Sequence, residues 1–284
     1  MFFSPTGGIV PVPIAGGETG QELKVVFFDV GQGDATLIIT PGGKRILIDG
    51  GTGEGAFGSE DQGKKVILPY LRRAGIERLD TVIATHPDFD HIGGLVSVMN
   101  AKNLEIGEVL DAGVPHPSEG YLELLQAVQD RPEIIYRQPR AGDVLEWGEE
   151  VKAEVLSPSY LMKDNNDSSV VVKLSYGDVS FLFTGDAAGS AEQIMNRKFG
   201  ARLRCTVLKA GHHGSKQSST QGFLQKVRPS AAVFSCGAEN TYGHPNEETI
   251  ERLRKVGATM YRTDEQGTIT ITTDEEDYRV ETEK

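Results

Sequence analysis

The stretch from Thr85 to Gly94 carries side chains suited to binding a metal ion. Two histidines and two aspartates fall within six residues: His86, Asp88, Asp90 and His91. We expect a buried strand to end at Thr85 and a helix to open at Gly93–Gly94, so that the short connection lets the four side chains converge. Imidazole nitrogens and carboxylate oxygens together suit zinc, manganese or iron. A solvated loop that caps a helix is the plainer interpretation, but four ligand-type residues at this spacing favour a metal site.

Regular elements predicted from the apolar pattern would position this segment. Strands are expected at 24–29, 35–40, 45–48, 80–85, 151–156, 169–174, 179–183, 205–209, 231–235, 259–262 and 268–272. Helices are expected at 64–74, 93–99, 121–129, 189–197, 220–226 and 247–255. Two sheets packed on each other with helices outside bury these faces, so the sequence predicts an α+β fold, an αββα four-layer sandwich. We expect one hydrolase domain over 23–284, preceded by a linker at 1–22 that is rich in Pro and Gly.

Composition limits the classes of partner and compartment. The formal net charge of −12 argues against unaided, sequence-blind DNA binding, although bound divalent cations can reverse the local sign. No run approaches the roughly 18 apolar residues of a membrane span, so no transmembrane segment is expected in this chain, and residues 1–20 do not resemble a signal peptide. Cys205 and Cys236 are expected at opposite ends of parallel strands and therefore unbonded. The acidic run at 274–277 is expected to be a solvated turn.

The histidine–aspartate segment resembles the His-x-His-x-Asp-His signature of the metallo-β-lactamase superfamily, with Asp88 in place of the second histidine. This variant is similar to the C-terminal domain of the ComEC family, the DNA-uptake channels of natural competence. Other stretches of the chain fit the same family: Phe28–Ala35, Ile48–Gly51, Phe183–Asp186, Leu208–Ser215 and Tyr242–Pro245. The similarity extends from about residue 23 to about residue 273.

The resemblance implies two divalent metal ions and assigns ligands to them. The first ion would be bound by His86 and Asp88, the second by Asp90, His91 and His212, and Asp186 would bridge the two. Without the resemblance, Asp186 would be read as a helix N-cap at a strand end. Asp49 would support the ligands from behind or simply cap a turn. His213 is expected to point away from His212, because adjacent side chains at a strand end point apart.

One departure from the superfamily pattern bears on the identity of the metal. The superfamily usually has a further histidine ligand between the first motif and the bridging aspartate. Here His116 is the only histidine in that interval, and it comes too early in the chain. The corresponding hairpin carries Asn165, Asn166 and Asp167 instead. A site richer in oxygen favours Mn²⁺ or Mg²⁺ over Zn²⁺, so Mn²⁺ is expected and Zn²⁺ stays open.

Several polar residues near these motifs are candidates for contacting the substrate. Asp90 or Asp186 could orient the attacking water, and His244 could donate to a phosphate oxygen or the leaving group, or could be an ordinary loop residue. The candidates for substrate binding are Lys209, His213, Ser215, Lys216, Asn166 and Asp34. The two lysines would act as point charges for phosphate, whereas Asp34 could merely stabilise its turn.

The resemblance implies a metal-dependent phosphodiesterase, a nuclease that degrades one strand of DNA during uptake, with single-stranded DNA as its substrate. Two other functions stay open: a hydrolase of a small phosphoester, another ester or a lactam, and a metal-stabilised binding module of a membrane channel without catalysis. If the chain is part of a longer protein, the remainder would be the membrane channel, and this domain would lie on the extracytoplasmic side of the bacterial membrane. Otherwise a cytoplasmic or secreted protein is expected.

Overall fold

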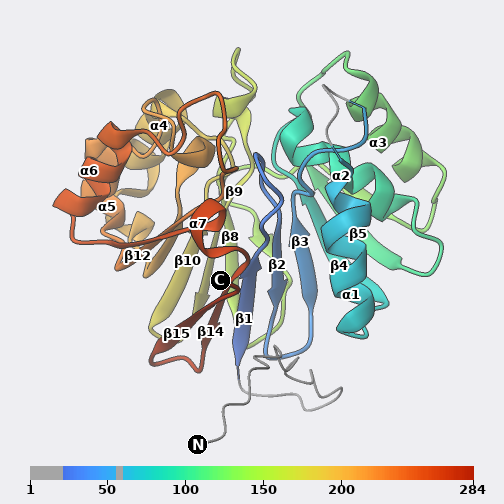
Figure 1. Ribbon diagram of the computed structural model, residues 1–284, viewed down its shortest axis with the longest axis horizontal. Helices are drawn as coiled ribbons and strands as arrows, with labels where there is room; N and C mark the ends of the chain where they lie inside the picture. The colour runs from blue at the N-terminus through green and yellow to red at the C-terminus, as the bar shows by residue number, and fades with distance from the viewer. Residues whose placement is uncertain (1–21, 56–59) are drawn as a thin grey trace, which may run out of the picture.

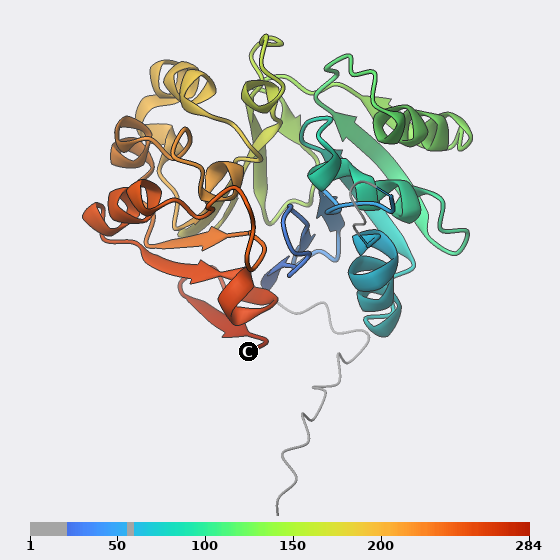
Figure 2. The ribbon, with the colours of Figure 1, turned by 45° about the horizontal axis from the view of Figure 1, so that its top comes forward.

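Two β-sheets face each other at the centre of the molecule, with helices on both outer sides (Figures 1 and 2). A computed structural model describes residues 22–55 and 60–284. The expected linker at 1–22 lies, apart from Glu22, outside the described residues. Within the described ranges, the strands form an eight-stranded and a seven-stranded sheet. The predicted α+β four-layer sandwich is confirmed.

The first sheet begins as the expected antiparallel meander and continues as parallel strands. Its strand order is β15-β14-β1-β2-β3-β4-β5-β6. The strands are β1 (Leu23–Phe27), β2 (Thr36–Ile39), β3 (Arg45–Ile48), β4 (Arg78–Ala84), β5 (Glu105–Asp111), β6 (Ile135–Arg137), β14 (Ile269–Thr273) and β15 (Tyr278–Thr282). Strands β1 to β3 pair antiparallel, whereas β3 to β6 pair parallel. Strand β14 pairs with β1, so the beginning and the end of the described chain contribute neighbouring strands to one sheet.

The second sheet has the order β13-β12-β11-β10-β9-β8-β7. Its strands are β7 (Val144–Leu145), β8 (Lys152–Ser157), β9 (Val171–Tyr176), β10 (Val179–Phe183), β11 (Val207–Lys209), β12 (Ala231–Phe234) and β13 (Thr259–Arg262). Strands β10 to β13 are parallel. Every residue of β12 is buried, as expected for a parallel strand that is covered on both faces.

Helices cover the outer face of each sheet. The helices beside the first sheet are α1 (Leu68–Arg73), which continues a π-helical turn at Gly63–Ile67, α2 (Phe89–Met99) and α3 (Glu119–Gln129) (Figure 1). Those beside the second are α4 (Gly189–Phe199), α5 (Gln221–Val227) and α6 (Glu247–Lys255). A short helix, α7 (Thr263–Gln266), follows β13. No helix in the described part of the chain is both long and apolar enough to span a bilayer.

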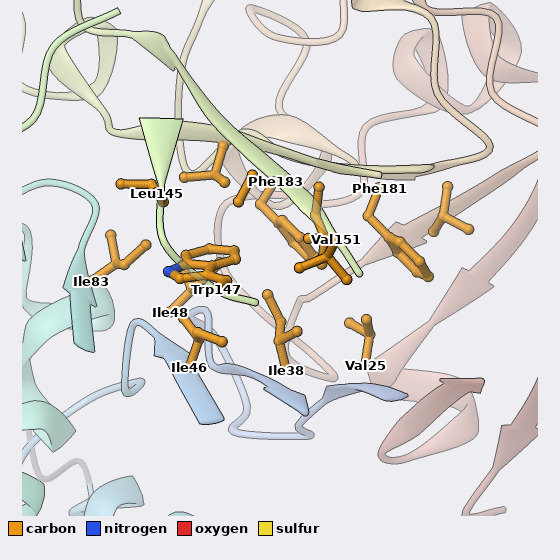
Figure 3. Close-up of a cluster of buried hydrophobic side chains, with 14 of the residues drawn as sticks. Val25, Ile38, Ile46, Ile48, Ile83, Leu145, Trp147, Val151, Phe181 and Phe183 are labelled. Atoms are coloured by element: carbon orange, nitrogen blue, oxygen red, sulfur yellow. The ribbon is translucent and has the colours of Figure 1, made fainter. Parts of the chain in front are cut away.

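Aromatic and branched side chains fill the space between the sheets. Figure 3 shows Ile38 and Ile46 of the first sheet facing Phe181 and Phe183 of the second, with Trp147 beside them. The rings of Phe181 and Phe183 are stacked, with centroids 6.1 Å apart. These side chains are almost completely buried, so the central core fixes the two sheets relative to each other and thereby the residues at their ends.

The structure corrects the sequence prediction in the number of strands and in the start of one helix. Strands β5, β6, β7 and β15 were not predicted. Helix α2 begins at Phe89 rather than at Gly93, because Asp88 has an extended backbone and acts as its N-cap residue. Asp90 and His91 therefore lie in the first helical turn, not in a loop. The acidic run at 274–277 is the exposed connection between β14 and β15, as predicted, and Cys205 and Cys236 are both free thiols.

Candidate metal centre

The predicted ligand residues meet at one end of the sheets, the upper end in Figure 1. They come from three segments that follow parallel strands: His86, Asp88, Asp90 and His91 after β4, Asp186 after β10, and His212 after β11, where the predicted substrate-binding residue His213 adjoins it. The first segment belongs to the first sheet and the other two to the second. The site therefore lies between the two halves of the molecule.

Close backbone contacts hold the start of α2 in place. The amide of Gly50 donates to the carbonyl oxygen of His91 at 2.7 Å, and the amide of Asp34 donates to that of Asp90 at 3.2 Å. A Cβ on Gly94 would lie 2.0 Å from the carbonyl oxygen of Gly50. Glycine is therefore required at this position of the helix, because any side chain would push the metal-binding segment away from β3.

Four buried side chains form the centre of the site. One ligand-type atom from each of Asp34, His91, Asp186 and His213 lies within 4.8 Å of all the others. His91 Nε2 lies 3.3 Å from Asp186 Oδ1, and His213 Nε2 lies 3.5 Å from Asp186 Oδ2. His213 Nε2 also lies 3.2 Å from Oδ2 of Asp90, whose side chain is 33% exposed. These atoms surround a position open to solvent on the Asp90 side.

The donor atoms of this cluster are unsatisfied. Among the buried side-chain atoms without a hydrogen-bond partner in residues 22–55 and 60–284, four belong to candidate ligands: Nε2 of His86, Nε2 of His91, Nε2 of His213 and Oδ1 of Asp186. A buried polar atom without a partner costs about 1–3 kcal/mol, so four at one point would be expensive in a structure without a function for them. Nitrogen and carboxylate donors of this kind fit a divalent transition-metal ion.

A second group of polar atoms surrounds Asp88. His86 Nε2 lies 3.6 Å from Oδ2 of Asp88, and the Asn165 side-chain amide donates to Oδ1 of Asp88 at 3.3 Å. The neighbouring Asn166 side chain lies 3.5 Å from Nδ1 of His212. His212 Nε2 in turn lies 3.6 Å from Asp186 Oδ2. The two asparagines therefore connect Asp88 and His212 on one side of the site.

Asp49 fixes the orientation of His91 from behind. Its carboxylate accepts hydrogen bonds from the Thr85 amide at 2.9 Å and from the Thr85 hydroxyl at 2.7 Å. His91 Nδ1 lies 2.8 Å from Asp49 Oδ2, so Nδ1–H donates to the carboxylate and Nε2 is left free to bind a metal. This is the supporting arrangement that the sequence suggested for Asp49.

Asp34 and Lys209 lie deeper than the sequence analysis expected. Both side chains are buried, the Lys209 ammonium is paired with Asp34, and it also donates to the carbonyl oxygen of Gly185 at 3.1 Å. Asp34 Oδ1 lies 3.3 Å from His213 Nδ1. A buried, paired lysine cannot reach a substrate as a point charge. Both residues lie beneath the cluster, and their role in substrate binding stays a prediction.

The two adjacent histidines both point into the site, contrary to the expectation for a strand end. His212 and His213 have φ values of 49° and 53°, in the left-handed region, so their side chains do not alternate as they would on a strand. His213 is buried among Asp90, Asp186 and Asp34, whereas the His212 side chain is 24% exposed. The tight turn Gly211–Gly214 thus delivers two imidazoles to one carboxylate, Asp186.

The charges of the cluster stabilise one another. Burial raises the pKa of Asp186, but the charges of His213 and His91 outweigh it and hold that pKa well below its usual range. Burial likewise lowers the pKa of His91, yet Asp186 and Asp49 raise it well above 6.5. The pKa of Asp90 is lowered in spite of burial, through His213 and His91. Without a metal, protons on the imidazoles would balance the carboxylates.

The remaining residues predicted to contact the substrate differ in how they lie relative to the ligand cluster. The His244 ring lies beside the site, with its centroid 5.6 Å from that of His212. Ser215 is buried, and its hydroxyl accepts a hydrogen bond from the Gln217 amide at 3.3 Å. Lys216 is exposed, and its carbonyl oxygen accepts from Arg252 at 2.8 Å. The Ser215 amide donates to the carbonyl oxygen of His212 at 2.7 Å, so Ser215 holds the ligand turn through its backbone, whereas no side-chain contact in the described residues connects Lys216 with the ligand cluster.

Sequence reasoning gave no role to two residues that the structure brings to the site. Asn165 binds Asp88, and the Thr85 hydroxyl lies 3.1 Å from His86 Nδ1. Asn165 was noticed only as part of a hairpin without histidine, and its pairing with Asp88 across 77 positions has no local signal. Thr85 directly precedes the ligand segment, but a threonine at a strand end is too common to single out.

Comparison with known proteins identifies related sequences and folds. The profile of the Metallo-beta-lactamase superfamily matches residues 28–238. ComE operon protein 3 of Bacillus subtilis is 33% identical over 260 residues, which cover 88% of this chain and 33% of that protein. Competence protein ComA of Neisseria gonorrhoeae is 34% identical over 250 residues, covering 88% of this chain and 32% of the relative. The chain thus spans about a third of the length of these relatives.

Solved structures share the fold at low sequence identity. The metallo-beta-lactamase fold protein YhfI from Bacillus subtilis aligns with a TM-score of 0.56 at 11% identity, covering 88% of this chain and all of YhfI. CmlA, a diiron β-hydroxylase from Streptomyces venezuelae, aligns with a TM-score of 0.56 at 14% identity, over 87% of this chain and 53% of CmlA. At these identities the likeness concerns the fold alone.

Proposed function

This chain belongs to the metallo-β-lactamase superfamily, and on that premise we propose that it is a metal-dependent phosphodiesterase that hydrolyses single-stranded DNA. The observation that carries the proposal is the set of four unsatisfied, buried ligand atoms on His86, His91, His213 and Asp186. They converge where a superfamily hydrolase would hold its metal, and their chemistry fits Mn²⁺ or Zn²⁺. We propose residues 23–284 as the catalytic unit.

We assign the candidate ligands to two groups. Asp90, His91 and His213 form the first group, which corresponds to the second ion of the sequence prediction. His213 replaces His212 in it, because His213 lies 3.2 Å from Asp90. His86, Asp88 and His212 form the second, with His212 and Asp88 joined through the adjacent asparagines. Asp186 touches both groups and would bridge them. His212 would then supply the imidazole that the hairpin at 165–169 does not provide. The second group contains two imidazoles and an exposed carboxylate, a donor set that fits Mn²⁺ or Zn²⁺.

The chain's own residues position the reactants. Bound divalent ions would supply a water with lowered pKa and offset charge on the phosphate oxygens. Asp49 holds the His91 ring, and the carbonyl oxygen of Ser235, 2.9 Å from His213 Nδ1, holds the His213 ring. Asp90, a third exposed, can orient the attacking water by accepting a hydrogen bond from it.

His244 stands on the solvent side of the histidine cluster and can serve the leaving group. Burial, followed by the charges of His213 and His212, lowers the pKa of His244 to about 4. The ring is therefore neutral at pH 7. A neutral imidazole can donate one N–H to a phosphate or leaving-group oxygen, but it carries no positive charge of its own.

DNA as the substrate is supported by the names of two relatives, a competence protein of Neisseria gonorrhoeae and a recombination protein of Haemophilus influenzae. It also agrees with the resemblance to DNA-uptake channels. We propose that the chain works beside such a channel on the extracytoplasmic side of the membrane. With a net charge of −12, affinity for a polyanion would depend on bound cations rather than on a basic surface.

Cleavage of a single-stranded oligonucleotide and of a chromogenic bis-phosphodiester, each with Mn²⁺, tests the proposal. Replacing Asp90 with Ala should lower kcat/KM at least about 100-fold, because it removes both a ligand and the group facing the water. Asp178→Ala is the matched control: Asp178 is exposed at the opposite end of β10 and should be silent.

Three outcomes would contradict the proposal. Asp90→Ala could cleave as well as the unchanged protein, which would separate the reaction from this site. A chromogenic lactam could be hydrolysed while both phosphodiesters stay intact, which would point to a different substrate class. Tight metal binding without turnover of any phosphoester would indicate a binding module.

A further inference from the structure

A short loop between β12 and α6 presents two aromatic rings beside the metal centre. In the sequence Tyr242–Gly243–His244, the glycine has a φ of 68° and reverses the backbone between the two side chains. The rings of Tyr242 and His244 are stacked, with centroids 5.8 Å apart and an interplanar angle of 23°. The His244 ring lies 5.6 Å from that of His212 and 6.2 Å from that of His213. A continuous row of rings therefore leads from the ligands to the surface.

The loop is rigidly held in this arrangement. Asn240 binds both backbone groups of His244: its side-chain oxygen accepts from the His244 amide at 3.0 Å, and its side-chain amide donates to the His244 carbonyl oxygen at 2.5 Å. Gly214, next to the ligand histidines, lets Pro245 pack closely, since a Cβ there would lie 2.6 Å from the proline ring. The position of His244 is thus tied to that of the ligand turn.

Tyr242 has a property that packing does not explain. Its side chain is 70% exposed, the highest value among the large hydrophobic residues that are exposed in the described part of the chain. The Tyr242 ring is nearly parallel to that of His244, and its exposed part is available to a ligand. A rigid aromatic ring presented to solvent beside a catalytic centre has the form of a stacking platform.

We propose that Tyr242 and His244 form a stacking site for a nucleobase of single-stranded DNA, next to the phosphate held at the metal centre. This inference rests on the proposed nuclease function and names how that site would recognise its substrate. Bases in a duplex are stacked on both faces by their neighbours, so an exposed ring can take a base only from an unpaired strand. Stacking tolerates every base and needs no basic surface, which suits a strongly acidic chain that would degrade a strand of any sequence.

Cleavage kinetics measured on two matched single-stranded substrates test this site. The substrates are a single-stranded oligonucleotide and one of equal length with abasic linkers throughout, both with Mn²⁺. Tyr242→Ala and Tyr242→Leu should raise KM for the base-containing strand roughly tenfold, and Tyr242→Phe should keep KM near that of the unchanged protein. On the abasic strand, all four proteins should be equal. Tyr160→Ala serves as the control, because Tyr160 is 58% exposed and no ring contact in the described structure connects it with a histidine.

The outcomes separate this inference from the proposed function. Equal losses on both substrates would overturn the stacking site, since they would indicate a structural or phosphate-binding role for Tyr242. Unchanged cleavage by Tyr242→Ala would overturn it as well. An oligonucleotide carrying 2-aminopurine gives a second readout without chemistry, because its fluorescence falls when the base stacks. If the protein fails to cleave DNA but quenches this probe in a Tyr242-dependent way, the proposed nuclease function is refuted and the stacking site is supported.

Discussion

At the scale of single residues, protons and metal ions compete for the same imidazole nitrogen atoms of the ligand cluster. His91 and His213 carry raised pKa values because carboxylates face them, and the same nitrogen atoms are the candidate metal ligands. A metal ion can bind only the deprotonated imidazole, so binding releases protons and strengthens as the pH rises. Metal loading and the stability of the metal-free protein should therefore change with pH in opposite directions.

The stability of the metal-free protein should fall between about pH 6.5 and pH 10. Burial lowers the pKa of His213, but Asp186 and Asp34 raise it to a net value of about 10 in the folded chain. The stabilisation from this shift is fully present below the unfolded value near 6.5 and is lost as the pH rises through about 10. Urea unfolding in the presence of a chelator measures it. His213→Gln should show a shallower decline, and an equal decline in both proteins would refute the assignment.

The sequence allowed the ligand-type residues of the site to be recognised, but not which of them contact one another. The four ligand-type residues at 86–91 could be recognised because their spacing is local. The choice between His212 and His213 could not, because it depends on a left-handed backbone at both residues and on the depth of Asp34, which is remote in the sequence. Burial of Lys209 was likewise not predictable, since its partner Asp34 precedes β2 whereas Lys209 ends β11, far along the chain.

At the scale of elements, the glycines of α2 set how closely the ligand segment approaches the first sheet. Gly94→Ala should destabilise the protein by about 2–3 kcal/mol, although alanine normally favours a helix, because the new Cβ would meet the Gly50 carbonyl oxygen. Gly222→Ala in α5 is the matched control. It has open space around it and should stabilise by about 0.5–1 kcal/mol. Chemical unfolding of both variants measures the difference; a stabilised Gly94→Ala would show that α2 can shift without cost.

Helices and strands with a regular apolar pattern were predicted, and strands without one were missed. Helix α6 and strand β13 have the predicted bounds, since both are clearly patterned and bracketed by turn residues. Strand β5 was not predicted because Glu105, Gly107 and Glu108 interrupt its apolar residues. Apart from Ile106, it is buried only at its C-terminal end. The two-residue β7 is too short to carry any period.

At the scale of the whole molecule, the ligands join two halves that otherwise meet through the central core. His86, Asp88, Asp90 and His91 belong to the half built on the first sheet, and Asp186, His212 and His213 to the other. An ion bound by both groups would cross-link the halves in the folded state only, and would stabilise that state by mass action.

Excess Mn²⁺ should therefore raise the melting temperature. At a concentration 100 times the dissociation constant, the gain is about 2.7 kcal/mol, or roughly 5–10 °C for a domain of this size. Differential scanning calorimetry with and without a chelator measures the shift. Asp186→Asn should lose most of it, because Asp186 is the carboxylate shared by both ligand groups. The same shift in this variant would place the bound ion elsewhere.

The pairing of β1 with β14 has a consequence for biosynthesis. Leu23 lies opposite Thr273 and Phe27 opposite Ile269. One edge of β1, the first of these strands to be synthesised, therefore stays unpaired until β14 has been synthesised. While the ribosome is still translating the middle of the chain, that edge is exposed to any other extended polypeptide. Such long-range pairing slows folding, and a nascent chain released before residue 269 would carry every metal-ligand candidate yet remain vulnerable to aggregation.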